Sequence, residues 1–314
     1  MSLLSTKTVP QDIFSIDVPF DVYQMSAEHD FQDYIPAIDE YYHFDPEATH
    51  SILAGLMFNK KVLLHGAHGT GKSSHIEQIA ARLKWPCLRI NLDGQLSRAD
   101  FVGRDAIVIE NGQQITCFKK GLLPFAIENP FILILDEYDA GRPEVMFVLQ
   151  RLLEENGQLT LTEQNQVIRP HPQFRIFATS NTVGTGDSTG LYHGVHYINQ
   201  AQMDRWSLTV QLNYPPAPLE AEIILEKTPS LQNEQGKDTI THMVNLATMI
   251  RTSFMADDIG NTISLRTLLN WADNIQLFGD IRQAFRLSYF NRCDESDKPK
   301  ISEFFQRCFG EDLS

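Results

Sequence analysis

The stretch Gly66-Ala67-His68-Gly69-Thr70-Gly71-Lys72-Ser73 decides the fold. It follows a short apolar run at 62–64 and opens a stretch of helical spacing over 74–83. A strand, a glycine-rich loop and a helix in this order let backbone N–H groups and the positive helix end hold a polyphosphate. In such a phosphate-binding loop (P-loop), Lys72 reaches the β- and γ-phosphates and the Ser73 hydroxyl ligates Mg²⁺. A plain glycine-rich turn can imitate the pattern, but the complete order predicts binding and hydrolysis of a nucleoside triphosphate, with the binding residues Gly66, His68, Gly69, Thr70, Gly71, Lys72, Ser73 and Ser74.

The bulk composition is that of an acidic globular protein. Of 314 residues, 42% are hydrophobic and 21% are charged, and the net charge is −14. No apolar run approaches the roughly 20 residues of a membrane helix, and residues 1–7 lack the basic flank and apolar core of a secretory signal. We therefore expect a cytoplasmic protein with no membrane segment. The negative charge argues against a nucleic-acid partner, because surfaces that grip a nucleic-acid backbone are basic.

Two further features of the composition are interpreted as structural. The four cysteines form no C-x-x-C pair, so we expect reduced thiols without a metal or catalytic role. Acidic residues gather between Asp12 and Glu40, and we interpret them as a solvated face rather than a docking surface.

The chain is expected to fold in three parts. Residues 1–45 have weak periodicity and form a partly irregular N-terminal extension. Over 46–214, short apolar strands alternate with helix-like segments, which is typical of an α/β sandwich whose parallel sheet is covered by helices. The proline-rich stretch 215–218 marks a boundary, and helical spacing beyond it predicts a helical lid domain over 215–314. The expected strands are Lys61–His65, Cys87–Asn91, Phe131–Asp136, Arg175–Thr179 and Leu208–Leu212.

Two insertions have the pattern of β-hairpins. Residues 106–110 and 113–118 flank Asn111-Gly112, which is a strong signal for a type I′ turn. Residues 158–162 and 166–169 flank a polar turn at 163–165. Neither hairpin is needed to complete a nucleotide-binding sheet, so we expect both to project toward a substrate or a neighbouring subunit.

Polar side chains end two of the predicted strands. Asp136 and Glu137 follow the apolar run 131–135, and a buried parallel strand delivers its carboxyl end to the ligand crevice. We predict that Asp136 binds Mg²⁺ and that Glu137 is the general base for the attacking water. Asn181 ends the next predicted strand and is expected to hold the γ-phosphate or that water. A plain acidic turn and a plain Asn turn are the alternatives.

Two arginines are candidates for completing the site. Arg205 precedes the last predicted strand and could reach a γ-phosphate bound by an adjacent subunit, as an arginine finger does. Ser264 suits a helix N-cap, and Arg266 lies within the following turn, from which it could fold over the nucleotide. From these patterns alone, an arginine paired with Asp204 and an ordinary helix-surface arginine are equally good interpretations.

The ordered set of motifs resembles the plan of AAA+ ATPases, in which rings of subunits share nucleotide sites. The two hairpins resemble the helix-2 and pre-sensor-1 inserts of the branch that contains chelatases and MoxR ATPases. The resemblance implies that 66–73 is Walker A and that Asp136 and Glu137 form Walker B. It also implies sensor 1 at Asn181, a trans-acting arginine finger at Arg205 and sensor 2 at Arg266.

Longer stretches narrow the resemblance to the ATPase subunits of aerobic cobaltochelatases. They are 68–78, 136–143, 167–172, 190–194, 198–200, 278–280 and 285–287, and the likeness covers roughly residues 35 to 312. His196 departs from the expected pattern. The resemblance implies ATP and Mg²⁺ as cofactors and a homo-hexameric ring. It implies two partners, a von Willebrand A-domain subunit (CobT-like) and a large corrin-binding subunit (CobN-like). Its implied activity is ATP-driven insertion of Co²⁺ into hydrogenobyrinic acid a,c-diamide in cobalamin biosynthesis.

Other functions remain open at this point. A MoxR-type chaperone ATPase that remodels or metallates another protein would use the same catalytic residues. A nucleic-acid motor and a nucleotide-dependent scaffold with negligible turnover are more distant alternatives. His193 and His196 resemble metal ligands, but two loop histidines without a third ligand favour partner or pore contacts.

Overall fold

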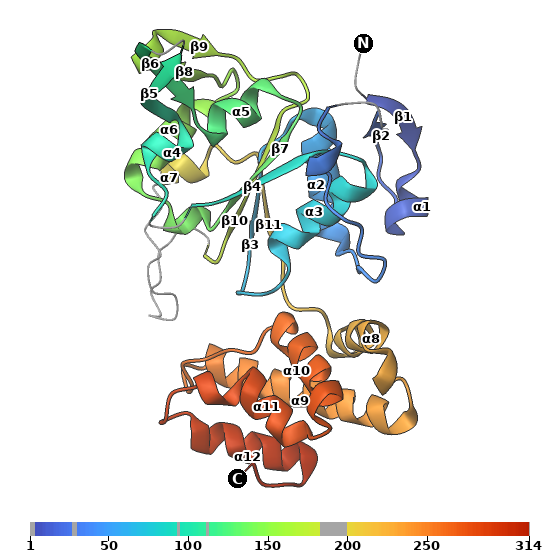
Figure 1. The fold of residues 1–314 in the computed structure, drawn as a ribbon. Helices are drawn as coiled ribbons and strands as arrows, with labels where there is room; N and C mark the ends of the chain where they lie inside the picture. The colour runs from blue at the N-terminus through green and yellow to red at the C-terminus, as the bar shows by residue number, and fades with distance from the viewer. Residues whose placement is uncertain (1–3, 27–29, 93–94, 111–112, 183–199, 314) are drawn as a thin grey trace. The chain divides into compact units, whose positions relative to one another are not determined.

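The computed structural model describes residues 4–26, 30–92, 95–110, 113–182 and 200–313 (Figure 1). The chain divides into two compact units. The first comprises Met1–Asp39, Phe44–Gly66 and Gly71–Leu212, and the second comprises Glu40–His43, Ala67–Thr70 and Asn213–Ser314. Residues 67–70, the middle of the P-loop, therefore belong to the second unit, although both of their neighbours in the chain belong to the first.

A five-stranded parallel sheet forms the centre of the first unit. Its strands follow the order β11-β3-β10-β7-β4. All five strands expected from the sequence are present, so the predicted α/β fold is confirmed. The central strands β3, β10 and β7 are almost entirely buried, as parallel strands covered on both faces are, whereas β11 and β4 at the ends of the sheet are partly exposed. Their bounds are β3 Val62–His65, β4 Cys87–Asn91, β7 Ile132–Asp136, β10 Arg175–Ser180 and β11 Leu208–Gln211.

Helices cover both faces of this sheet (Figure 1). Side chains alternate along each strand, so Leu133 and Leu135 pack on one face while Ile132 and Ile134 pack on the other. The first of these faces carries α4 (Arg98–Phe101), α5 (Leu122–Glu128) and α6 (Pro143–Leu152). The second carries α2 (Pro46–Phe58) and α3 (Lys72–Arg82). Two short helical segments also belong to this unit: η2 (Tyr138–Ala140) lies between β7 and α6 in the chain, and α7 (Gln200–Met203) precedes β11.

The N-terminal residues add a small layer to the first unit. β1 (Leu4–Thr8) pairs antiparallel with β2 (Val22–Met25), and α1 (Pro10–Phe14) lies between them in the chain. Phe14, Val22 and Met25 are buried in the same core as α2 and α3. A 3-10 turn, η1 (Gln32–Tyr34), follows. This segment therefore contributes side chains to the core of the nucleotide unit.

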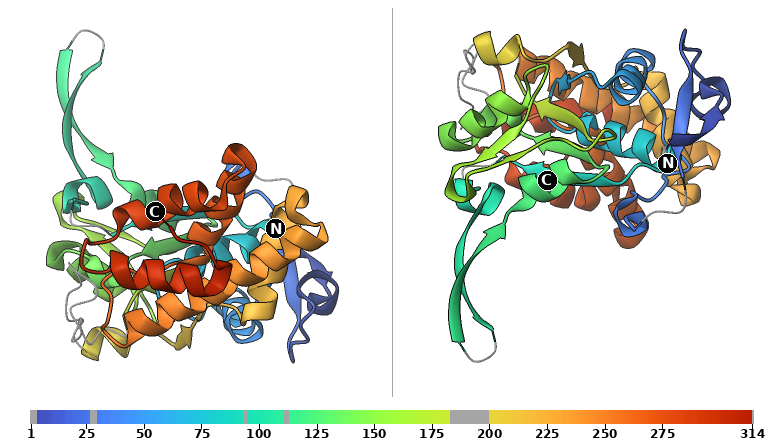
Figure 2. Two further views of the ribbon diagram at one scale, coloured as in Figure 1. Left: turned by 90° about the horizontal axis from the view of Figure 1, so that it is seen from below. Right: turned by 90° about the horizontal axis from the view of Figure 1, so that it is seen from above.

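Both expected hairpins are present. β5 (Gly103–Glu110) and β6 (Gln113–Lys120) pair antiparallel along their whole length and extend away from the sheet of their unit (Figure 2). Apolar side chains on this hairpin lie in solvent, with Ile107 71% and Ile109 75% exposed. The second hairpin is shorter and joins β8 (Leu159–Leu161) to β9 (Gln166–Ile168) through the 3-10 turn η3 (Thr162–Gln164).

The second unit is helical beyond Asn213. The side chains expected on the buried face of its long helix α9, among them Ile240, Met243 and Val244, are buried. Ser264 caps α10 as predicted, because its hydroxyl accepts a hydrogen bond from the Thr267 N–H at 3.2 Å. Its helices are α8 (Ala217–Lys227), η4 (Pro229–Leu231), α9 (Glu234–Met255), α10 (Leu265–Phe278), α11 (Ile281–Ser288), η5 (Phe290–Arg292) and α12 (Lys298–Phe309).

Candidate nucleotide site

The P-loop begins and ends on glycines with left-handed backbone angles. Gly66 follows β3 with φ of 150°, and a Cβ at that position would collide with the carbonyl oxygen of Leu212. Gly71 has φ of 88° and is the N-cap of α3. Both positions favour glycine over other residues. Helix α3 then begins at Lys72, so the lysine and Ser73 lie in its first turn, and the N-terminal turn of a helix attracts anions.

Lys72 is buried beside the end of β10. Its Nζ donates to the Gly66 carbonyl oxygen at 2.8 Å and to Asn181 Oδ1 at 3.1 Å. Burial lowers the pKa of Lys72 to about 8, and the nearby carboxylates of Asp136, Asp139 and Glu137 only partly oppose it. A polyphosphate bound in the loop would bring negative charge to this desolvated cation and so favour its protonated form. Two residues predicted to face the γ-phosphate, Lys72 and Asn181, are thus in direct contact.

The Asp136 carboxylate at the end of β7 is fully engaged. Its Oδ1 accepts hydrogen bonds from Ser73 Oγ at 2.6 Å and from Thr179 Oγ1. Its Oδ2 accepts from Nε of Arg89 at 2.9 Å and also from the Nη2 of that residue. Burial raises the pKa of Asp136, but these hydrogen bonds and the Arg89 charge outweigh it, so the pKa lies below its usual value. The carboxylate is therefore ionised at neutral pH.

The oxygens of Ser73 and Asp136 suit Mg²⁺. Mg²⁺ prefers oxygen ligands and is usually held by one or two carboxylates together with substrate phosphates and water. The pair offers one hydroxyl and one ionised carboxylate, 2.6 Å apart, next to the P-loop. No group of three or more His, Cys, Asp or Glu side chains within the described ranges could hold a metal ion. This donor set therefore fits an ion that arrives with a nucleotide.

Glu137 has a left-handed backbone conformation, with φ of 56° and ψ of 46°. A non-glycine residue in this region stores strain and persists where the surroundings fix it, which is common at functional sites. Its N–H lies 3.4 Å from Thr179 Oγ1, which also donates to Asp136. The Thr179 hydroxyl on β10 therefore contacts both the Asp136 carboxylate and the Glu137 backbone.

Asp139 organises the end of β10, and sequence reasoning missed it. Its Oδ2 accepts from the N–H of Asn181 at 3.0 Å, the N–H of Thr182 at 2.9 Å and Thr182 Oγ1 at 3.0 Å. Its Oδ1 is buried and has no hydrogen-bond partner among the described residues. Asp139 thus fixes the backbone that presents Asn181 to Lys72. The signal that could have found it is a third carboxylate, three residues after Asp136.

The remaining predicted residues lie further along the chain. Arg205 follows α7, and its guanidinium donates to the Ala201 carbonyl. It lies near Tyr138, whose pKa burial raises to about 12 in spite of that positive charge. No ion pair between Arg205 and Asp204 occurs in the part of the chain that the structure describes, against one of the alternatives for Arg205. Arg266 is exposed in the first turn of α10, and its role at a nucleotide stays a prediction, as does that of Arg205.

The middle of the P-loop is bonded within the second unit. Tyr214 donates its hydroxyl hydrogen to the His68 carbonyl oxygen at 2.6 Å, and Thr70 Oγ1 donates to the Ala67 carbonyl at 3.0 Å. Gly69 approaches Ser264 so closely that a Cβ there would collide with it. Tyr214 was not predicted, because an aromatic residue before a proline run gives no sequence signal of its own. His193 and His196 lie outside the described residues.

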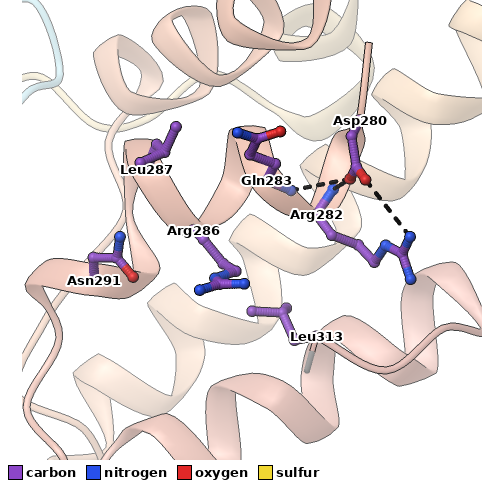
Figure 3. A pocket seen from close by; sticks show the side chains of 7 residues that line it. All are labelled: Asp280, Arg282, Gln283, Arg286, Leu287, Asn291 and Leu313. Carbon is purple, nitrogen blue, oxygen red and sulfur yellow. Dashed lines mark hydrogen bonds and ion pairs between the residues drawn. The ribbon is translucent and has the colours of Figure 1, made fainter. Parts of the chain in front are cut away.

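A separate pocket lies on the second unit (Figure 3). It has a volume of about 410 Å³ and involves none of the predicted site residues. Arg282 lies 3.6 Å from Asp280 and 3.5 Å from Glu311, so its charge already has two acidic partners. The lining residues are Asp280, Arg282, Gln283, Arg286, Leu287, Asn291 and Leu313. Within the described chain, no helix is long and apolar enough to cross a membrane.

Known proteins resemble both units of the chain. A family profile described as an AAA domain of the dynein-related subfamily matches residues 61–193. The C-terminal family of CbbQ, NirQ and NorQ matches residues 220–306. Midasin of Dictyostelium discoideum is 29% identical over 245 residues, which are 76% of this chain and 4% of midasin. A RuvB variant of Thermotoga maritima aligns over 84% of this chain and 75% of its own, with 14% identity and a TM-score of 0.49.

One relative is similar along almost the entire sequence. The aerobic cobaltochelatase subunit CobS of a Sinorhizobium species is 49% identical over 312 residues, which are 99% of this chain and 93% of that protein. The AAA-domain match spans the P-loop, the Asp136-Glu137 pair and Asn181. Identity of this extent, together with the site geometry, settles the family. The chain belongs to the CobS family of aerobic cobaltochelatase subunits, which are AAA ATPases.

Proposed function

We propose that this chain is the ATPase motor subunit of an aerobic cobaltochelatase. The observation that carries the proposal is the convergence of Lys72, Asn181 and the Ser73–Asp136 pair at the end of the parallel sheet. These side chains come from the P-loop helix and from two neighbouring strands, and their contacts range from 2.6 to 3.1 Å. Such a site binds a polyphosphate and directs its γ-phosphate to the carboxyl ends of the parallel strands.

The residues divide the work of hydrolysis between binding and water activation. Lys72 holds the β- and γ-phosphates as a point charge, and Asn181 orients the γ-phosphate or the lytic water. Ser73 and Asp136 hold Mg²⁺, which neutralises charge on the phosphates when it is bound. Glu137 takes the proton of the attacking water as general base. Arg205 completes the site of a neighbouring subunit, and Arg266 couples the helical unit to the nucleotide state.

ATP hydrolysis drives the insertion of Co²⁺ into hydrogenobyrinic acid a,c-diamide in cobalamin biosynthesis. Co²⁺ and the corrin are substrates of the whole complex. We assign the corrin to a large CobN-like subunit and the mechanical link to a von Willebrand A-domain subunit that is CobT-like. This chain acts in the cytoplasm as a homo-hexamer. The family membership and the 49% identity to a cobaltochelatase subunit support this assignment over a MoxR-type remodeller.

The long hairpin β5–β6 is the surface that we assign to partner contact. Ile107 and Ile109 alternate along β5, so they lie on one face of the hairpin, and both are largely exposed. Exposed apolar side chains that gather on one face mark candidate interaction sites. Shortening this hairpin is expected to spare ATP binding and to weaken partner-dependent cobalt insertion.

The decisive experiment is reconstituted cobalt insertion. The full chain, the two partner subunits, ATP, Mg²⁺, Co²⁺ and hydrogenobyrinic acid a,c-diamide are combined, and the cobalt corrin is followed by absorbance. Glu137→Gln should abolish insertion, while Glu144→Gln, the same change at an exposed residue of α6, should not.

Two outcomes would contradict the proposal. ATP hydrolysis without insertion in any combination of partners would favour a MoxR-type remodeller with another client. Hydrolysis that only nucleic acid stimulates would favour a nucleic-acid motor.

A further inference from the structure

Arg89 lies beside the predicted metal ligand and has no assigned role. It projects from β4, whose neighbour in the sheet is β7, and Asn91 of β4 is in register with Asp136. Both of its hydrogen bonds to Asp136, from Nε and Nη2, fall on the same oxygen, Oδ2. The other oxygen, Oδ1, faces the hydroxyls of Ser73 and Thr179. Arg89 therefore places a positive charge in direct contact with this carboxylate.

A second carboxylate lies on the other side of the same guanidinium. Glu77 belongs to α3, and its Oε2 is 3.8 Å from Arg89 Nη1. The Arg89 side chain is 43% exposed, compared with 27% for Glu77 and 12% for Asp136. Burial raises the pKa of Glu77, and the Arg89 charge opposes that rise. The guanidinium is thus the most exposed charge of the three, and it has two anions within reach.

A guanidinium on Oδ2 and a metal ion beside Ser73 and Oδ1 would weaken each other's hold on the same carboxylate. Arginine has donors only, so it cannot ligate a cation, and two positive charges on one carboxylate repel each other. When Mg²⁺ arrives with a nucleotide, the Arg89–Asp136 contact competes with metal ligation. Glu77 offers the displaced guanidinium a second ion pair.

We propose that Arg89 is a positioning residue that acts as an exchangeable counter-charge. It pairs with Asp136 while the site holds no metal, and it moves to Glu77 when Mg²⁺ binds with the nucleotide. This inference rests on the proposed nucleotide site. An exchangeable counter-charge and a residue that merely fixes the Asp136 rotamer predict opposite effects on metal affinity. Removing the first should tighten metal binding, whereas removing the second should weaken it.

Metal binding is measured with Mn²⁺ in place of Mg²⁺. The full-length chain is titrated in the presence of ADP, and free Mn²⁺ is counted by electron paramagnetic resonance. This readout does not depend on turnover. Arg89→Met removes the competitor and should tighten Mn²⁺ binding about fivefold, which corresponds to roughly 1 kcal/mol for a half-exposed ion pair. Glu77→Gln removes the carboxylate to which the displaced Arg89 guanidinium would move, so it should weaken Mn²⁺ binding by a similar factor.

Arg151→Met is the matched control. Arg151 pairs with Glu154 on the surface of the same unit, and its side chain is also largely exposed. This variant should leave Mn²⁺ affinity unchanged, and Arg89→Met should bind ADP alone as the wild type does.

Each outcome decides between the roles. Weaker or unchanged Mn²⁺ binding by Arg89→Met would overturn the proposal, and so would tighter or unchanged binding by Glu77→Gln. If Arg89→Met does not fold, the direction in which Glu77→Gln changes Mn²⁺ affinity still decides whether the proposal holds. A wild-type chain that binds neither ADP nor Mn²⁺ would instead remove the nucleotide site itself, and Arg89 with it.

Discussion

Two arginine–carboxylate pairs, one in each unit, use the same chemistry in different surroundings. In the helical unit, Arg251 donates Nη1 and Nη2 to the two oxygens of Glu220 at 2.8 and 2.7 Å. Its Nε donates to the Ile263 carbonyl at 2.9 Å, and its guanidinium lies 3.8 Å from the ring of Tyr214. In the nucleotide unit, the two Arg89 hydrogen bonds converge on a single oxygen of Asp136.

The surroundings determine what each pair can do. The Arg251 side chain is 13% exposed and that of Glu220 is 1% exposed, so neither charge can return to water while the unit is folded. Breaking such a pair leaves a buried charge without compensation. Arg89 is half in solvent and has Glu77 as a second anion, so the loss of one contact is met by water or by the other carboxylate. We infer that the first pair is structural and the second is exchangeable.

The largest effect is expected for Arg251→Met. Because Glu220 would stay buried without its partner, the free energy of unfolding should fall by about 3–5 kcal/mol. Urea unfolding followed by circular dichroism measures this loss. Arg307→Met, which breaks an exposed pair with Glu303 on α12, is the control and should change it by less than about 1 kcal/mol. A loss for Arg251→Met as small as that of the control would mean that the pair is not structural.

Removing both partners should be milder than removing one. In Glu220→Leu with Arg251→Met no buried charge remains, so much of the lost stability should return. The Ile263 carbonyl would still lack its donor, which leaves a loss of about 1 kcal/mol. The same urea titration measures it. A double variant less stable than Arg251→Met alone would contradict this account of the buried charge.

A smaller effect is expected for Tyr214→Phe. The change keeps the ring against Arg251 and removes the hydroxyl that donates to His68 at 2.6 Å. Tyr289→Phe is its match, because Tyr289 donates to the Asn261 carbonyl at 2.7 Å in the same unit. Each variant should lose about 1 kcal/mol of stability. Since His68 lies in the P-loop, only Tyr214→Phe should also lower ADP affinity, measured by calorimetry, and equal affinities would refute a positioning role for Tyr214.

The sequence predicted the elements well because local patterns specify them. The runs 62–64 and 131–135 consist of consecutive apolar residues, and a strand buried on both faces needs such a run. The order of strand, glycine loop and helix predicted that Lys72 and Ser73 lie at the start of the P-loop helix. The parallel direction of β10 and β7 predicted that Asn181 and Asp136 lie at the same end of the strands. The N-terminal segment was harder to predict, because its short elements add Phe14, Val22 and Met25 to the core at irregular spacing.

Residues that act across long sequence separations escaped prediction. Arg89 meets Asp136 from 47 positions away, and Asp139 meets Asn181 from 42. A lone arginine in a strand or an aspartate in a turn has no periodic signal, and only the register of β4 on β7 reveals the first of these contacts. The roles of Arg205 and Arg266 remain predictions because they involve a nucleotide and, for Arg205, a neighbouring subunit.

The smallest stability effect is expected for Arg89→Met, and it tests the comparison most directly. The same substitution that removes about 3–5 kcal/mol at the buried pair should remove less than about 1 kcal/mol here. Arg89 is already half in solvent, and Asp136 keeps its hydrogen bonds from Ser73 and Thr179. Screening by salt should shrink even this loss, so the wild type and the variant should converge when urea titrations are repeated at high ionic strength. Arg251→Met should show no such convergence, because salt does not reach its pair. If Arg89→Met instead lowers the free energy of unfolding by several kcal/mol and the loss persists in salt, both arginine pairs are structural. Arg89 then does not exchange between Asp136 and Glu77.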